Sequence, residues 1–236
     1  MAVDKVPGVD VAFLRELPGR IFFYPSAGRD WMEPLSQFAD GMDEFRFVDI
    51  AYQFEEVSPI ALEGWDWLPD STVLRGPAVS QMSVHEDENG HPFRHLEPAW
   101  LSHRYRNPHD GRQVLVTRRR GFGQYALHEL PDASLGVFWH RGDSQGEGGS
   151  NVWYLANRPR RHPPLSNLFD VLRRKLAYPA LIASDGANTR FAELRAAARQ
   201  DMGAPIAFDK LGLRWRQVGR LKRRTVLWLV EPLGSP

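Results

Sequence analysis

Residues 20–50 decide the fold of this chain, and they read RIFFYPSAGRDWMEPLSQFADGMDEFRFVDI. The apolar run at 20–24 is typical of a buried strand, and turn-forming residues follow it at 25–30. Apolar side chains then recur at helical spacing from 31 to 40, and a second apolar run at 45–50 predicts another strand. Strand, helix and strand in this order form a right-handed crossover with parallel strands. The segment therefore predicts an α/β fold.

The same alternation returns after residue 112. Apolar runs predict strands, and helical spacing predicts helices, in the order strand 113–117, helix 123–130, strand 134–139, helix 165–176, strand 179–184 and helix 189–200. Two last apolar segments, 213–220 and 225–231, flank a basic turn and predict a closing antiparallel hairpin. We expect residues 1–236 to form a single α/β domain with a Rossmann-like three-layer sheet and this terminal antiparallel hairpin.

Residues 52–111 interrupt that order. Apolar stretches at 77–84 and 93–105 predict strands, and the dipeptides Asn89-Gly90 and Asp110-Gly111 are strong hairpin turns. The segment therefore predicts a β-rich, antiparallel insertion within the domain.

Composition excludes several classes of protein. The chain has no Cys, so it has no disulfide, no thiolate nucleophile and no Cys-ligated metal. It shows no signal sequence and no apolar run long enough to span a bilayer, which predicts a cytoplasmic protein without membrane contact. Five of the eight His residues fall between 85 and 109, but their spacing matches no metal-ligand pattern and predicts no metal site.

Charge is distributed unevenly along the chain. Residues 1–100 hold 18 acidic and 7 basic side chains, whereas residues 101–236 hold 11 acidic and 23 basic. Either the two parts pair within the fold, or the basic part attracts nucleic acid or an acidic protein. For the second alternative, the candidate basic runs lie at 118–120, 158–162, 173–175 and 222–224.

Three polar loops follow predicted strands, at 26–30, 140–150 and 185–188. In a parallel sheet these loops meet at the edge where ligands bind. The loop 140–150 holds four glycines around Asp143 and Glu147. Its carboxylates are candidates for acid–base catalysis or cation binding, and its backbone amides for anion binding. A surface hairpin is the alternative.

The order of elements, with Asp49 near the end of the second strand and a terminal hairpin, resembles that of the class I S-adenosylmethionine-dependent methyltransferases. This resemblance implies S-adenosylmethionine at the carboxyl edge of the sheet. It implies that Ser26, Gly28 and Asp30 line the cofactor and that Asp49 holds its ribose. The substrate would then lie near the candidate catalytic residues, which are His140, Asp143, Glu147 and Asp185. The alternative is a cofactor-free binding module that uses its basic C-terminal half on nucleic acid or an acidic protein.

Overall fold

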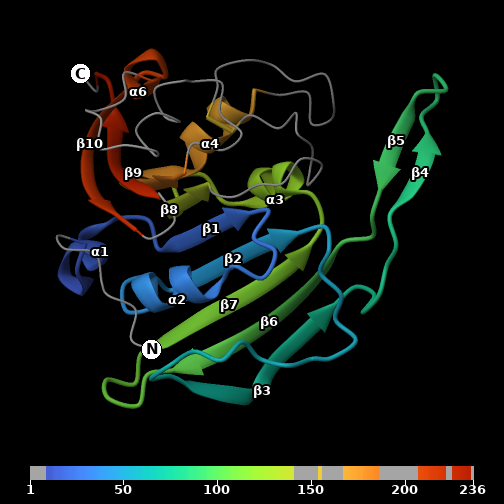
Figure 1. Ribbon diagram of the computed structural model, residues 1–236, viewed down its shortest axis with the longest axis horizontal. Helices are drawn as coiled ribbons and strands as arrows, with labels where there is room; N and C mark the ends of the chain where they lie inside the picture. Colours follow the sequence, from blue (N-terminus) through green and yellow to red (C-terminus); the bar gives the residue numbers. More distant parts are fainter. Residues whose placement is uncertain (1–8, 141–153, 156–166, 186–206, 222–224, 235–236) are drawn as a thin grey trace.

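A computed structural model describes residues 9–140, 154–155, 167–185, 207–221 and 225–234 (Figure 1). Within these ranges the chain forms eleven strands and five helices, so the predicted α/β class is confirmed. Nine strands make one mixed sheet in the order β10-β11-β9-β8-β1-β2-β7-β6-β3.

Five parallel strands form the centre of the sheet. They are β1 (Ile21–Pro25), β2 (Glu44–Asp49), β7 (Gln113–Arg120), β8 (Leu135–His140) and β9 (Leu176–Ser184). The strand order reverses at β1, because β2 pairs with one edge of β1 and β8 with the other. The carboxyl ends of all five strands lie along one edge of the sheet, and the crevice at such a reversal is where α/β proteins bind ligands.

Antiparallel strands flank this centre on both sides. On one side, β11 (Val226–Pro232) pairs with β9, and β10 (Leu213–Arg220) pairs with β11 at the sheet edge. The predicted terminal hairpin is therefore confirmed. On the other side, β6 (Ala99–Arg106) pairs with β7, and β3 (Asp66–Arg75) forms the opposite edge. All four described strands of the segment 52–111 are thus antiparallel, as predicted, and two of them, β3 and β6, extend the main sheet.

The core occupies both faces of the sheet because side chains alternate along each strand. Phe22 belongs to one buried cluster, with Leu14 of α1 (Val11–Glu16) and Leu35 of α2 (Met32–Phe38). Phe23 belongs to the second cluster. That cluster includes buried residues of α3 (Gly123–Glu129), α4 (Leu168–Lys175) and α6 (Ala207–Lys210). Helices therefore contact both faces. Within the described ranges, none of them has the length and apolar character needed to cross a membrane.

A separate hairpin projects from this body and is called the arm below (Figure 1). It consists of β4 (Ser83–Glu86) and β5 (Pro92–His95), joined by the predicted turn with Gly90 at φ 75°. The predicted strand at 93–105 is in fact divided between β5 and β6, because Pro98 has no N–H to donate to a ladder.

Candidate ligand site at the carboxyl edge of the sheet

The loop after β1 is held by the carboxylate of Asp49. Its Oδ2 accepts the N–H of Gly28 at 2.6 Å and its Oδ1 accepts the N–H of Ala51 at 2.8 Å. The side chain is buried, with 2% of the residue exposed. Asp49 thus joins the ends of β1 and β2 by satisfying two backbone donors.

Two residues of this loop have left-handed backbone conformations. Gly28 has φ 52°, which costs a glycine little, but Ser26 has φ 57°, which is strained for a residue with a Cβ. Such strained residues cluster at ligand sites, where the surrounding structure over-determines them. Asp30, in the same loop, accepts a hydrogen bond from the buried Tyr24 hydroxyl at 3.2 Å. The four predicted cofactor residues therefore lie together, and Gly28 contacts Asp49 directly.

His140 ends β8, beside β1 at the strand reversal. Its ring stacks on Phe138 at 6.0 Å between centroids and meets the edge of Tyr154 at 5.9 Å. Burial lowers the pKa of His140 to about 4, and the nearby Asp185 carboxylate opposes this shift only in part. The imidazole is therefore neutral at pH 7. In the described part of the chain its Nδ1 has no hydrogen-bond partner.

The structure brings together some of the predicted catalytic residues. Asp185 follows β9, and its N–H donates to the His140 carbonyl at 3.3 Å, so the two residues are adjacent. Asp143 and Glu147 lie outside the described residues.

Tyr154 was not predicted as a site residue, although it connects the two sides of the strand reversal. A Cβ added to Gly123 would lie 2.5 Å from the Tyr154 hydroxyl and 2.7 Å from Cβ of Pro25. Tyr154 therefore packs against the start of α3 and the end of β1 while it contacts His140. The only sequence signal was Gly123, because a glycine at the start of a helix permits such close packing.

The arginine run at 118–120 does not form the exposed basic face that one alternative required. Arg119 is 6% exposed, forms an ion pair with Glu129 at 2.6 Å and lies over the Trp100 ring. Arg120 is fully buried. The prediction of an exposed run is therefore wrong for these two residues, whose alternating side chains enter the two faces of β7.

Arg118 lies beside the loop after β1, between aromatic rings. Its guanidinium carbon is 5.7 Å from the ring centroid of Trp31, which follows the loop, and 6.0 Å from that of Phe54. It has no carboxylate ion-pair partner within the described ranges, and its Nη2 donates only to the Ser58 carbonyl, at 2.6 Å. Burial lowers its pKa. Arg118 is thus a partly desolvated cation without a compensating anion.

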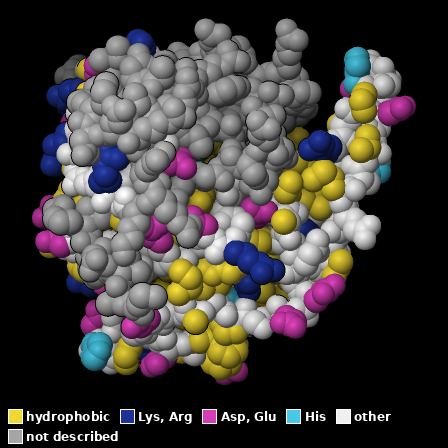
Figure 2. Space-filling view, viewed as in Figure 1, with side chains coloured by type: hydrophobic (Ala, Val, Ile, Leu, Met, Phe, Trp, Pro, Cys, Tyr) yellow, Lys and Arg dark blue, Asp and Glu magenta, His cyan; other side chains and the backbone are white. Residues whose placement is uncertain are grey.

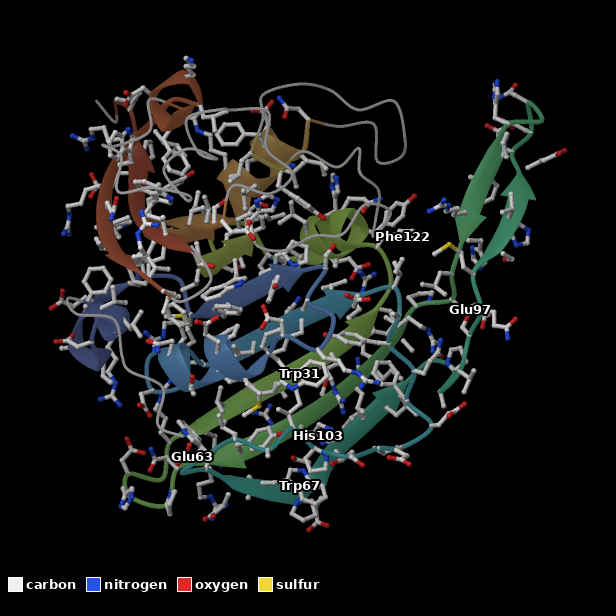
Figure 3. All side chains as sticks on the ribbon, in the orientation of Figure 1. Trp31, Glu63, Trp67, Glu97, His103 and Phe122 are labelled. Carbon is white, nitrogen blue, oxygen red and sulfur yellow. The ribbon has the colours of Figure 1, made fainter. Side chains whose placement is uncertain are left out.

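A second buried histidine lies next to Arg118. Figure 3 shows Trp31, from the segment before α2, over β7, with His103 of β6 and Trp67 of β3 beyond it. The His103 ring meets that of Trp67 edge-on at 6.1 Å, and its Nδ1 is 3.0 Å from the Thr72 hydroxyl. Desolvation, and then the charge of Arg118, lower the pKa of His103 to about 4. Neutral His103 therefore adds no positive charge beside Arg118.

The remaining basic runs are only partly described. Arg173 and Arg174 are exposed at the end of α4, whereas 158–162 and 222–224 lie outside the described residues. Arg214 and Arg216 are exposed on β10, and Figure 2 shows Lys and Arg side chains along this margin of the molecule. Arg214 is partly neutralised by Glu231 at 3.1 Å.

The histidines clustered in the sequence separate in the structure. His85 and His95 share the arm, His91 forms an exposed pair with Asp87, and His103 is buried in the body. No group of three or more His, Asp or Glu residues in the described ranges is arranged to hold a metal ion.

Comparison of the chain with protein-family models, with curated proteins and with solved structures finds no match.

Proposed function

We propose that this protein is an enzyme of methyltransferase-like, Rossmann-type architecture that binds a nucleotide-type ligand at the carboxyl edge of the sheet, beside β1. The arrangement that supports this proposal is the parallel centre with its reversal at β1, helices on both faces and a terminal antiparallel hairpin. Asp49 also ends the second strand, as the family resemblance implies.

One observation carries the proposal: an uncompensated cation on β7 lies beside the strained loop that leaves β1 at the strand reversal. Ser26 is held in a left-handed conformation, and Trp31, which follows the loop, packs against Arg118. An indole and a guanidinium are suited to a ligand that has both an aromatic base and an anionic group. His140, at the end of the neighbouring strand, is buried and neutral, so it adds no positive charge to this edge of the sheet.

The residues fit S-adenosylmethionine poorly at one position. The family resemblance assigns the acid after the second strand to the ribose, but the Asp49 carboxylate is buried and both of its oxygens accept backbone N–H groups. We therefore assign Asp49 as a positioning residue for the loop. Asp49 is therefore not among the residues that we expect to contact the ligand.

Calorimetric titration tests the proposal with adenosine, AMP and S-adenosylmethionine. We expect AMP to bind below about 1 mM and more tightly than adenosine, because AMP, unlike adenosine, presents an anion to Arg118. Arg118→Met is expected to weaken AMP binding roughly tenfold and to leave adenosine binding unchanged. Arg106→Met, at an exposed site on β6, is the matched control. Absence of heat for all three ligands at millimolar concentration would contradict the proposal.

The binding-module alternative has less support. Two arginines of the run 118–120 are buried, and the exposed arginines of the basic half in the described residues lie on β6, α4 and β10.

A further inference from the structure

The arm is an isolated two-stranded sheet whose side chains face solvent. Among the described residues its strands pair only with each other, and apart from the half-buried Ser83 every residue of β4 and β5 is exposed. Val84 is 71% exposed and Phe93 is 43% exposed. A lone hairpin is marginally stable in water, and apolar side chains on its surface favour a contact that covers them.

The base of the arm is fixed to the body. Arg120 donates from Nε to the Glu97 carbonyl at 3.0 Å and from its terminal nitrogens to the carbonyls of Ala78 and Pro77. Residues 77–78 precede β4 and Glu97 follows β5, so one buried side chain binds both ends of the arm. Figure 3 shows Glu97 at this base. The arm therefore projects in a defined direction.

One face of the arm carries a pair of histidines. The register places His85 opposite Phe93 and Ser83 opposite His95, so these four side chains share a face. The rings of His85 and His95 are 5.2 Å apart between centroids and inclined by 83°.

This spacing matches two imidazoles on one tetrahedral zinc ion. With a Zn–N bond of about 2.0 Å and a ring centre about 1.1 Å behind the nitrogen, two such rings have centroids roughly 5 Å apart. The Ser83 hydroxyl lies 2.8 Å from Nε2 of His85 and is placed to orient that ring, as outer-shell groups do at metal sites.

The arm of one molecule supplies only half of the ligands. Zinc in a structural site takes four, and no third His, Asp or Glu in the described part of this chain joins the pair. A two-fold axis through the metal brings the same pair from a second copy, and it buries Phe93, whose ring is 5.8 Å from that of His85, beside the ion.

Charge makes this association depend on the cation. The arm carries the exposed acids Glu86, Asp87 and Glu88 near its turn, with Arg94 as its one arginine. Two acidic arms repel each other, and a divalent cation between them offsets that repulsion.

We propose that two copies of this chain associate through their arms around one zinc ion held by His85 and His95 of each copy.

Sedimentation analysis of the untagged full-length chain, freed of metal by a chelator, tests this proposal. We expect a monomer without metal and a dimer at half an equivalent of zinc chloride per chain, with the monomer restored by excess chelator. His85→Ala and His95→Ala are each expected to stay monomeric with zinc while keeping their circular dichroism. His109→Ala removes an exposed histidine from a different turn and should dimerise like the parent chain.

Three results would overturn the proposal: a monomer at every zinc ratio, a dimer that excess chelator leaves intact, or zinc-dependent dimers of both arm variants. Cobalt titration gives an independent readout, because a four-imidazole site should produce the intense visible absorption of tetrahedral cobalt. Weak octahedral absorption alone would also overturn it.

Discussion

Arg120 shows how far the role of a residue can differ from the run that contains it. In the sequence it completes three consecutive arginines, whereas in the structure it is fully buried with carbonyl partners on both ends of the arm and Gln53 Oε1 at 3.1 Å. A buried guanidinium is stable only when most of its donors are satisfied, and these acceptors supply that. Its burial lowers its pKa, but it stays protonated at physiological pH.

Arg120→Met is therefore expected to reduce the free energy of unfolding by about 3 kcal/mol, since it leaves several buried carbonyls without donors. Urea denaturation followed by tryptophan fluorescence measures this change. Arg106→Met, on the exposed face of β6, should change the same quantity by less than about 0.5 kcal/mol. Equal effects of the two substitutions would show that the buried contacts of Arg120 contribute nothing to the free energy of unfolding.

His103 makes stability depend on pH. Its pKa is about 4 in the folded chain and 6.5 in the unfolded one, so the unfolded state takes up the proton first as pH falls. The stability contributed by neutral His103 is complete above pH 6.5 and is lost progressively between pH 6.5 and 4. His140 acts in the same direction.

His103→Asn should flatten the fall of unfolding free energy between pH 7 and pH 5, because it removes one of these two titrating groups. Urea titrations at several pH values measure the slope. His109→Asn, in an exposed turn, is the control and should leave the slope unchanged. A slope in His103→Asn as steep as in the parent chain would contradict this account.

At the scale of single residues, the sequence predicted which residues lie near one another better than it predicted their contacts. Gly28 and Asp49 do lie in contact, because parallel strands end at one edge, whereas the role of Ser26, Gly28 and Asp30 in binding a cofactor stays a prediction. The binding of Asp49 to the Gly28 N–H was not predictable, since it depends on the left-handed geometry of the loop. In the sequence Arg118 is one of three consecutive arginines. Identical residues give no apolar and polar alternation, so the sequence does not show which of them point into the protein.

At the scale of elements, β8 lies unusually close to the segment that enters β1. A Cβ on Gly136 would lie 2.2 Å from the Gly19 carbonyl oxygen, and a Cβ on Gly19 would lie 2.3 Å from the Gly136 nitrogen. Both contacts are with backbone, which cannot rotate away as a side chain can. Two glycines that are far apart in the sequence therefore permit this close approach of the two backbones.

Gly136→Ala is expected to destabilise the chain by about 2 kcal/mol or more, because the two segments must separate. Thermal denaturation monitored by circular dichroism measures the effect. Gly64→Ala is a matched control: no atom lies within 4 Å of its added Cβ, so it costs only about 1 kcal/mol for its positive φ. If Gly136→Ala is no more destabilising than Gly64→Ala, the close approach at Gly19 and Gly136 does not require a glycine for stability.

Elements with a buried apolar run were predictable, whereas β3, at one edge of the sheet, was not. β1, β2, β8 and the hairpin of β10 and β11 fall on predicted segments, as does α3. β3 was missed because its exposed residues include Asp66, Pro69 and Asp70, which disfavour strands. The helix predicted at 165–176 is shorter, since Asn167 caps α4 through Phe169 N–H and β9 begins at Leu176.

At the scale of the whole molecule, the uneven charge along the chain is partly resolved by pairing between its halves. Asp43 accepts from Arg112 of the basic half at 2.9 Å and from Arg20 at 3.2 Å. Burial opposes ionisation of Asp43, but these two arginines outweigh it and lower its pKa. Arg15 pairs with Asp110, but here the base belongs to the acidic half and the acid to the basic half. Among the ion pairs between described residues, Arg112–Asp43 is the one that joins an acid of residues 1–100 to a base of residues 101–236, so pairing between the two parts accounts for only a small share of the uneven charge.

The position of β1 has a consequence for how the chain folds. One of its edges pairs with β2, where Ile21 meets Glu44, but the other pairs with β8, where Ile21 meets Leu135. A chain emerging from the ribosome therefore completes its first crossover long before the strand that closes the other side of β1 exists. Until then the most central strand of the finished sheet is an open edge, and its closure over so long a loop is intrinsically slow.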